Sequence, residues 1–366
     1  MRVDRITYAD FAGLADCWDC LTRGVPFRSW TWVDAWWRHY RRGREFCVLT
    51  VRDDLGQLVG AAPWCFEETK ARGRVLRFLG SGEARGENLS LLATAEHEDA
   101  VAQAIAHWLM HASEHKPDHW DLLALERVVV EDRMLMKLLH ALNREGCSTY
   151  RSADEQCWRI DLPSEWDAYL ASMSKSHRKQ IRRTEQGVQL SALTVHASAD
   201  TAGAQPGFDL LRELHQERAA SLNEPGLFAS GAFCEFYRDV MPRLLAQQRL
   251  QLHWVAHGDK PIAAELYLLG SAVSYGYLAG LAPDALDLEP SRVLHLAVIK
   301  QAIAEGQYRL ENSHGDQPFK AHWRAQSHMV TDLHVVPPST RAQVRHGAWR
   351  VSETMRHLLR SGFMMK

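Results

Sequence analysis

The sequence predicts a mixed α/β fold built from two domains in tandem. The chain has 366 residues, more than one average hydrophobic core accommodates. Segments with the period-2 pattern of strands alternate with segments of helical periodicity in both halves. The order of elements starts again after Leu162-Pro163. We therefore predict domains at residues 1–162 and 163–340, followed by a basic helix at 341–366.

The first half begins with a strand at residues 2–8 and a helix at 9–22. A Trp-rich helix then ends at Gly43, and its aromatic stripe is typical of a buried core face. Asp54-Leu55-Gly56 predicts a hairpin turn. The later elements of this half are short strands within 75–93, a helix at about 95–115, a strand at 120–128, a helix at 131–145 and a strand near 156–162.

The second half shows a similar order of elements, which indicates a duplicated architecture. We expect helices at 164–186, 207–221, 231–247, 291–305 and 318–324, and strands at 188–196, 250–257, 261–269, 272–280, 307–313 and 329–336. In the basic helix, Val344, Ala348, Val351 and Met355 share one face. We expect this face to pack against the second domain, with a membrane-surface or partner helix as the alternative.

Composition narrows the classes of function. The net charge of −2 gives no global basic field, so we expect no DNA partner. Seven cysteines without a framework of spacings fit a reducing cytoplasm, and none of their spacings predicts a metal site. The N-terminus lacks the apolar core of a signal peptide, and no apolar run has the length of a membrane span. The glycine motifs of P-loop and dinucleotide-binding enzymes are also absent.

Two segments are candidates for binding an anion. The stretch SKSHRKQIRR, which includes Lys175, Arg178 and Arg182, has five cations and no acid. It forms either a solvated charged face or a site for a phosphate. Ser291 is a candidate N-cap for the helix that follows Pro290, and the start of a helix attracts anions.

Polar residues in the second half are candidates for catalysis. Glu265 lies in the middle of an apolar strand, where it either faces solvent or points into a cleft as a general base. His314, Asp316 and Lys320 surround a break between a strand and a helix. Asp316 and Lys320 either cap the helix as an ion pair or flank a reacting carbonyl group, with Lys320 stabilising an oxyanion.

Four stretches of the sequence resemble the CelD/BcsL-type acyltransferases, a branch of the GNAT superfamily related to the FemAB aminoacyltransferases. The stretches are SWTWVDAWW, RFLGSGEARGENLSLL, YLASMSKSHRKQIRR and LEPSRVLHLAVIKQAIAEGQYRLENSHGDQPFKAHW. The last contains Gly315-Asp316, Phe319-Lys320 and Trp323, which match the order and spacing of the family motif. The chain departs from the family where a Gly-rich pyrophosphate loop is usual, and at the residues before Gly315.

The resemblance implies two GNAT-like domains and an N-acyltransferase that moves an acyl group, such as acetyl, from acyl-CoA to an amine. The acceptor would be a small molecule or a precursor of a cell-envelope polysaccharide, and no metal is required. By this resemblance the donor approaches the helix start, residues 290–293. The residues that we assign to donor binding are Pro290, Ser291, Arg292 and Val293, and those that we assign to the acceptor are Lys175, Arg178, Arg182, Tyr277 and Trp323.

The assigned mechanism is direct attack of the amine on the thioester, with Glu265 or a water chain from Asp316 as the base. Two alternatives stay open. One is a FemAB-like transferase that uses aminoacyl-tRNA, which the near-neutral charge disfavours. The other is a non-catalytic GNAT-like binding or assembly module. The sequence does not specify an oligomeric state.

Overall fold

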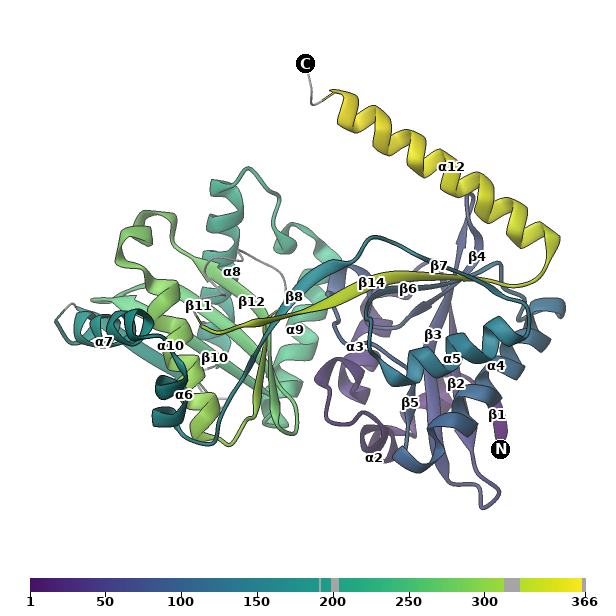
Figure 1. Cartoon of the computed structure of the whole chain (residues 1–366), viewed down its shortest axis with the longest axis horizontal. Helices are drawn as coiled ribbons and strands as arrows, with labels where there is room; N and C mark the ends of the chain where they lie inside the picture. Colours follow the sequence, from purple (N-terminus) through teal and green to yellow (C-terminus); the bar gives the residue numbers. More distant parts are fainter. Residues whose placement is uncertain (191, 199–203, 313–322, 364–366) are drawn as a thin grey trace. The chain divides into compact units, whose positions relative to one another are not determined.

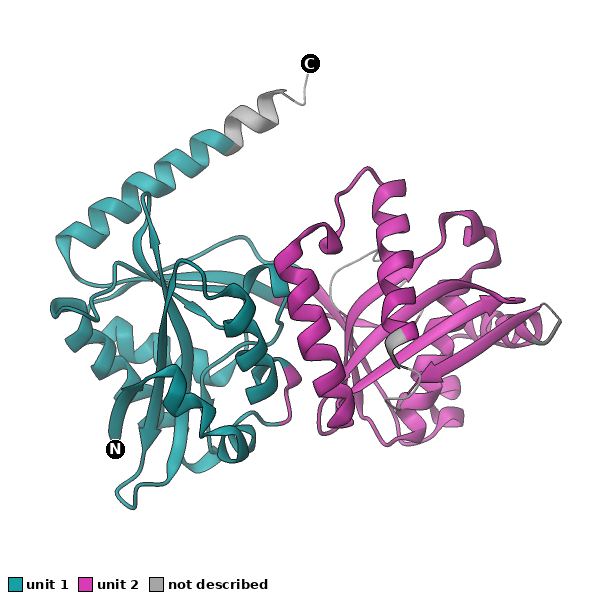
Figure 2. Cartoon of the chain, turned by 180° about the vertical axis from the view of Figure 1, so that it is seen from behind, with its two compact units in different colours: residues 1–23, 27–155, 330–366 teal, residues 24–26, 156–329 magenta. Residues whose placement is uncertain are grey.

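The structure is a computed structural model that describes residues 1–190, 192–198, 204–312 and 323–363. It divides into two compact units (Figure 2). Unit 1 contains residues 1–23, 27–155 and 330–366, and unit 2 contains residues 24–26 and 156–329. Residues 330–340, which we placed in the second domain, belong to unit 1. The reason is strand pairing, since the last strand runs antiparallel to a strand of the first half, with Val335 opposite Leu123.

Unit 1 begins with strand β1, small helices and the Trp-rich helix α3 (Figure 1). Ser29 caps α3 by accepting a hydrogen bond from the N–H of Trp32, and Trp32 is fully buried, as its helical stripe predicted. The elements of this unit are β1 Arg2–Ile6, α1 Tyr8–Ala12, α2 Ala15–Trp18, α3 Trp30–Tyr40, β2 Arg44–Arg52, β3 Leu58–Thr69, β4 Gly73–Phe78, β5 Leu92–Ala93, α4 Glu98–Glu114, β6 Leu122–Val129, α5 Arg133–Arg144, β7 Ser148–Arg151, β14 Gln326–Val336 and α12 Thr340–Phe363.

Unit 2 has two groups of helices and its own six strands. Its elements are β8 Glu155–Asp161, α6 Trp166–Ser172, α7 Lys175–Leu190, β9 Leu193–Ser198, α8 Ala204–Ser221, α9 Gly231–Ala246, β10 Leu250–His257, β11 Lys260–Leu269, β12 Val273–Leu281, α10 Pro290–Ala304 and β13 Arg309–Asn312. These bounds confirm most of the predicted elements to within a few residues.

The two units share one strand topology. In unit 1 the order is β1-β2-β3-β4-β6-β14, and in unit 2 it is β9-β10-β11-β12-β13-β8. In both, the first four strands are antiparallel, the fifth is parallel to the fourth, and a helix (α4 or α10) connects that parallel pair. The duplicated architecture that the element order indicated is therefore confirmed at the level of pairing.

The sheet of unit 2 has helices on both faces. Leu252 and Gly280 lie on the face that α8 covers, because Cβ positions at Gly207 and Gly280 would meet Leu252 and Leu214. The opposite face contains His253, which contacts Gln301 of α10. Helices α6 and α7 pack against α10 on this second face. An apolar core lies between α10, β8 and β13, and the candidate site is in this part of unit 2.

The predicted helix at 164–186 is two helices, α6 and α7, separated at Met173 and Ser174. Met173 has extended backbone angles (ψ 155°), and Ser174 Oγ accepts a hydrogen bond from the N–H of His177. The side chain of Arg178 donates to the carbonyl oxygen of Met173 (2.6 Å). Continuous helical periodicity hid this break, because Met173 keeps the apolar register although it ends α6.

The apolar face of the C-terminal helix is exposed, which corrects our expectation that it packs against the second domain. Helix α12 belongs to unit 1 and docks through Ala342 and His346, which are 1% and 4% exposed. Val351, on the predicted packing face, is instead 58% exposed. Among the described residues, every helix is too short or too polar to cross a membrane.

Candidate active site

A cavity of about 370 Å³ lies in unit 2 where α7 meets the start of α10. Its lining residues come from α7, the start of β9 and the segment that opens α10: Gln180, Arg183, Thr184, Gly187, Val188, Leu193, Leu288, Glu289, Arg292 and Val293. It thus joins the two segments that the sequence indicated as anion-binding. Two of the lining side chains, Arg183 and Arg292, are cationic.

The start of α10 presents its first turn at this cavity. Glu289 is the N-cap, with left-handed backbone angles (φ 48°, ψ 44°), and Pro290 is the first helical residue. Our assignment of Ser291 as the cap was wrong, because proline favours the first helical position and places the cap before it. No side chain caps the helix. The first turn therefore retains the partial positive charge that favours an anion.

The charges around the cavity are partly balanced. The guanidinium of Arg292 donates to the carboxylate of Glu289 at 2.6 Å. Arg183 is exposed on α7, one helical turn from Gly187 of the same lining face. Both arginines and the start of α10 thus line one cavity, a combination of groups that attracts anions. Arg183 belongs to the basic stretch SKSHRKQIRR, but we did not predict it as a binding residue. The signal that could have identified it is that positions 180, 183, 184 and 187 share one helical face.

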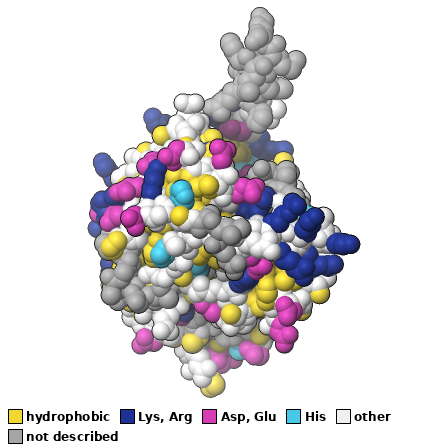
Figure 3. All heavy atoms as spheres, turned by 90° about the vertical axis from the view of Figure 1, so that its left-hand side faces the viewer, with side chains coloured by type: hydrophobic (Ala, Val, Ile, Leu, Met, Phe, Trp, Pro, Cys, Tyr) yellow, Lys and Arg dark blue, Asp and Glu magenta, His cyan; other side chains and the backbone are white. Residues whose placement is uncertain are grey.

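The other cations of α7 have different environments. Lys175 and Arg182 are exposed outside the cavity lining, whereas Arg178 donates to the carbonyl oxygens of Ala171 and Met173. Figure 3 shows Lys and Arg side chains gathered on the face of the molecule that includes α7. Arg178 therefore has a structural role at the break before α7, whereas Lys175 and Arg182 are exposed to solvent.

Strands β12 and β13 are parallel neighbours in unit 2. Their parallel pairing extends from Val273 opposite Arg309 to Gly276 opposite Asn312, and β12 continues to Leu281 beyond the last described pair. The residue that follows Gly276 on β12 is Tyr277. It is the extra residue of a β-bulge, because Tyr267 and Leu266 of β11 pair with residues 276 and 278. From this bulge the chain leads through residues 283–288 to the cavity.

Glu265 is a partly buried carboxyl group on β11. Its cross-strand neighbours are His253 and Ala279, and its Oε2 accepts a hydrogen bond from Oη of Tyr267 at 2.8 Å. Burial raises the pKa of Glu265 to about 7, with the hydrogen bond from Tyr267 opposing the rise. Helix α10 thus covers the face of β11 that carries Glu265, whereas one of our two predictions was that this face is exposed to solvent. A carboxyl group with this pKa can exchange a proton at neutral pH.

His253 completes the polar row beside Glu265. It is 1% exposed, and burial lowers the pKa of its ring. Its Nε2 lies 2.8 Å from Oε1 of Gln301, and Gln301 donates to Glu305. Glu305 also accepts two hydrogen bonds from Gln251, the cross-strand neighbour of Tyr267. This network fixes α10 over β10 and β11, so it positions the face on which Glu265 lies.

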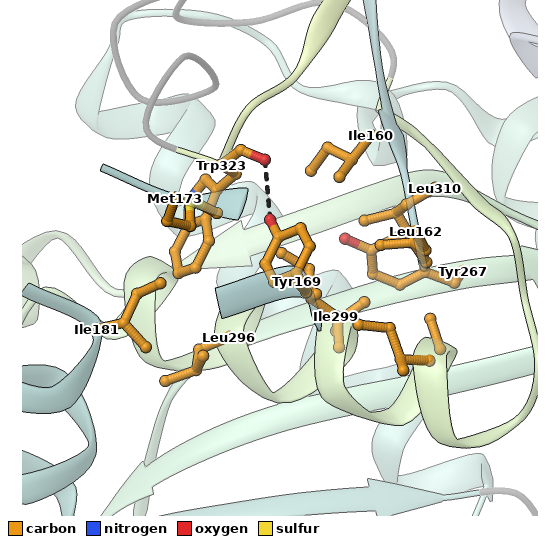
Figure 4. Packing of buried hydrophobic residues seen from close by; sticks show 13 residues of the cluster. Ile160, Leu162, Tyr169, Met173, Ile181, Tyr267, Leu296, Ile299, Leu310 and Trp323 are labelled. Atoms are coloured by element: carbon orange, nitrogen blue, oxygen red, sulfur yellow. Dashed lines mark hydrogen bonds between the residues drawn. The ribbon is translucent and has the colours of Figure 1, made fainter. Parts of the chain in front are cut away.

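Trp323 lies in the core. It is 3% exposed, and its carbonyl oxygen accepts a hydrogen bond from Oη of Tyr169 at 2.8 Å (Figure 4). The Trp323 ring lies 5.1 Å from the ring of His295. The indole that we assigned to the acceptor is therefore a packing residue. His314, Asp316 and Lys320 lie outside the described residues. Within the described chain, no group of three or more His, Cys, Asp or Glu side chains is placed to hold a metal.

Comparisons with known proteins show what the chain is similar to in sequence and in fold. Residues 171–321 match the family described as "Acetyltransferase (GNAT) domain". No curated protein sequence matches the chain. Among solved structures, FemX is 12% identical with a TM-score of 0.64, over 94% of this chain and 99% of that one.

Two further solved structures have the same fold. The C-terminal domain of a putative lysylphosphatidylglycerol synthetase from Agrobacterium fabrum is 11% identical (TM-score 0.55; 93% of this chain, 95% of that one). L-PGS from Bacillus licheniformis is 12% identical (TM-score 0.53; 95% and 97%). The chain therefore has the predicted mixed α/β fold, in two units of one strand topology, and the segment that matches the acetyltransferase (GNAT) family lies in unit 2.

Proposed function

We propose that the chain is an N-acyltransferase that moves an acyl group, such as acetyl, from acyl-CoA to an amine. The observation that carries the proposal is the cavity that joins Arg183 of α7 with Arg292 and the uncapped start of α10. Both arginines lie within residues 171–321, the segment that matches the acetyltransferase domain. The negative charge of a coenzyme A pyrophosphate complements the two arginines and the start of the helix, which supports the proposal.

The chemistry would take place beside Glu265 of β11 and the bulge at Tyr277 of β12. The amine attacks the thioester carbonyl carbon, a C–N bond forms, the C–S bond breaks, and the amine proton passes to a base as the thiolate leaves. Glu265 is our candidate base, because its pKa of about 7 suits proton transfer at neutral pH. The backbone at the Tyr277 bulge is our candidate donor to the oxyanion. Lys320, Asp316 and His314 stay predicted contributors.

We further propose that the protein is related to the CelD/BcsL-type acyltransferases, that it is located in the cytoplasm, and that its acceptor is a small-molecule amine or a precursor of a cell-envelope polysaccharide. The four stretches of sequence resemblance support the first and third. The exposed cations Lys175 and Arg182 support an acceptor or carrier with an anionic group.

The first test is a pair of thermal unfolding titrations with acetyl-CoA and with acetyl-pantetheine, which lacks the pyrophosphate. We expect acetyl-CoA to raise the melting temperature in a concentration-dependent manner, because a ligand of the native state stabilises it by mass action. Acetyl-pantetheine at the same concentrations should have a much smaller effect. Absence of any shift with acetyl-CoA would favour the alternative of a non-catalytic binding or assembly module.

A FemAB-type transferase that uses aminoacyl-tRNA is the second candidate. The exposed cations of α7 outside the cavity, together with the fold shared with FemX, favour it. The discriminating measurement is binding of tRNA over a series of salt concentrations. A steep fall of affinity with salt, combined with no binding of acetyl-CoA, would replace the first candidate with the second.

A further inference from the structure

Helix α12 is attached to unit 1 by its first ten residues. Arg345 Nη1 donates to Oδ2 of Asp121 at 2.7 Å, and Gln343 donates to the carbonyl oxygen of Pro337 at 3.0 Å. The His346 ring lies 4.7 Å from that of Tyr150. The helix is 24 residues long, or about 36 Å at 1.5 Å per residue. Figure 1 shows its C-terminal half leaving the sheet of unit 1.

No described part of the chain covers an apolar stripe on α12. Val344, Val351 and Met355 are 67%, 58% and 60% exposed, and Ala348 between them is also exposed. Their spacing places all four on one side of the helix, away from the side through which Ala342 and His346 dock. Scattered exposed apolar residues are ordinary, but three large ones aligned over three turns form a continuous strip.

The charge of this segment indicates what covers the strip. Residues 341–366 contain six Lys or Arg residues and one acid, Glu353, in a chain whose net charge is −2. Positive charge is thus concentrated on the element that carries the exposed apolar side. An apolar strip flanked by arginines is the pattern of helices that lie in the surface of an anionic bilayer. A second copy of the same helix would bring two strongly positive segments together.

We propose that α12 is a membrane-surface helix that docks unit 1 on anionic phospholipid. The apolar strip enters the boundary between headgroups and acyl chains. Arg341, which is 67% exposed and has only a 3.9 Å contact with Asp121, contacts lipid phosphates. Asp121 holds Arg345, which fixes the docked half of the helix and leaves the strip facing outward. This proposal does not depend on acyl transfer, because no residue of the candidate active site takes part.

The test is cosedimentation of the full chain with vesicles of phosphatidylcholine alone and of phosphatidylcholine mixed with phosphatidylglycerol. The variant is Val351→Asp with Met355→Asp, two exposed positions where substitution leaves packing intact. The matched control is Leu55→Asp, 84% exposed at the β2–β3 turn of the same unit. We expect binding to the mixed vesicles only, at least about tenfold weaker in the double variant and unchanged in the control.

Circular dichroism and the melting temperature of each variant accompany the assay, so that a loss of binding is not confused with unfolding. Equal binding of the double variant, equal binding to neutral vesicles, or no binding of the wild-type chain would each overturn the proposal. A wild-type dimer in sedimentation velocity that the double variant converts to a monomer, without vesicle binding, would also overturn it and assign the strip to a second copy.

Discussion

The hydroxyl group of Tyr267 donates a 2.8 Å hydrogen bond to the carboxyl group of Glu265, two residues earlier on the same face of β11. Burial raises the pKa of Glu265 to about 7, and this hydrogen bond acts in the opposite direction. Tyr267 is 3% exposed within the core beneath α10, so its position is fixed by packing. The pair is therefore a titrating group held in a defined orientation.

Replacing Glu265 by Gln should reduce acyl transfer by about 10²–10⁴-fold if Glu265 is the general base. In the wild type, turnover should rise with pH through about 7, because the deprotonated carboxylate is the active form. The measurement is the pH profile of free coenzyme A release. Unchanged turnover and an unchanged profile in Glu265→Gln would remove the residue from the mechanism.

Replacing Tyr267 by Phe removes the hydrogen bond that favours the charged carboxylate. We expect the pKa of Glu265 to rise, so the inflection of the pH–rate profile should move to higher pH while activity at high pH is retained. A purely structural role of the hydroxyl group would lower activity at all pH values without moving the inflection.

The attachment of α12 should weaken as the pH falls from about 6.5 to about 4. Burial lowers the pKa of both His334 and His346 to about 4, so the unfolded state binds more protons than the folded state in this window. The positive charges of Arg72 and Arg350 disfavour protonation of both histidine rings. The negative charge of Asp332 favours protonation of His334. Stability measured by urea unfolding should be complete above pH 6.5 and decrease below it.

The control for this pH effect is the variant His346→Gln, which has no titrating group at that position. Its free energy of unfolding should depend less steeply on pH than that of the wild type. Equal slopes for the two proteins between pH 4 and 6.5 would show that His346 does not contribute.

Replacing Asp121 by Ala should lower the stability of unit 1 by about 1–3 kcal/mol, because it leaves two donors without their acceptor. Asp121 is 5% exposed and accepts hydrogen bonds from Arg345 and from the N–H of Arg74. The control is Asp4→Ala, which breaks an exposed ion pair with Arg2. That change should cost at most about 1 kcal/mol. Equal losses of stability in chemical denaturation would contradict the assignment.

Gly280 should not tolerate a side chain. A Cβ there would lie 2.6 Å from the N atom of His215 and 2.7 Å from Cβ of Leu214, so Gly280→Ala should destabilise unit 2 by about 1–3 kcal/mol. Gly347, on α12, has no atom within 4 Å of such a Cβ. Gly347→Ala should stabilise its helix by up to about 1 kcal/mol. Melting temperatures that move in the same direction would contradict this account of the α8–β12 contact.

The sequence predicted the elements well because their periodicity is local. It placed the strand at 329–336 but assigned it to the wrong domain, since the pairing of Val335 with Leu123 spans more than 200 residues. It identified α7 and the start of α10 separately, and it emphasised Arg182 rather than Arg183. Whether Arg182 or Arg183 faces the cavity depends on the angle at which α7 meets α10. The periodicity of a single helix does not determine that angle.

The structure also differs from the sequence predictions at Trp323, at Ser291 and on α12, and each difference has a local physical cause. Trp323 matched a family motif and was assigned to the acceptor, yet burial against Tyr169 and His295 makes it a core residue. Ser291 has the chemistry of a cap, but Pro290 occupies the first helical position and moves the cap to Glu289. The apolar strip on α12 predicted an amphipathic helix. The side through which this helix docks is determined by its contacts with Asp121 and Tyr150.

The most direct test of the donor site is calorimetric titration of acetyl-CoA into three proteins: the wild type, Arg183→Ala and Arg182→Ala. Arg183 lines the cavity, whereas Arg182 is its exposed neighbour outside the lining. We predict that Arg183→Ala raises the dissociation constant about tenfold or more, from loss of a charge-assisted contact, while Arg182→Ala leaves it within about twofold. Equal affinities for all three proteins, or a larger loss in Arg182→Ala, would contradict the assignment of this cavity to the donor.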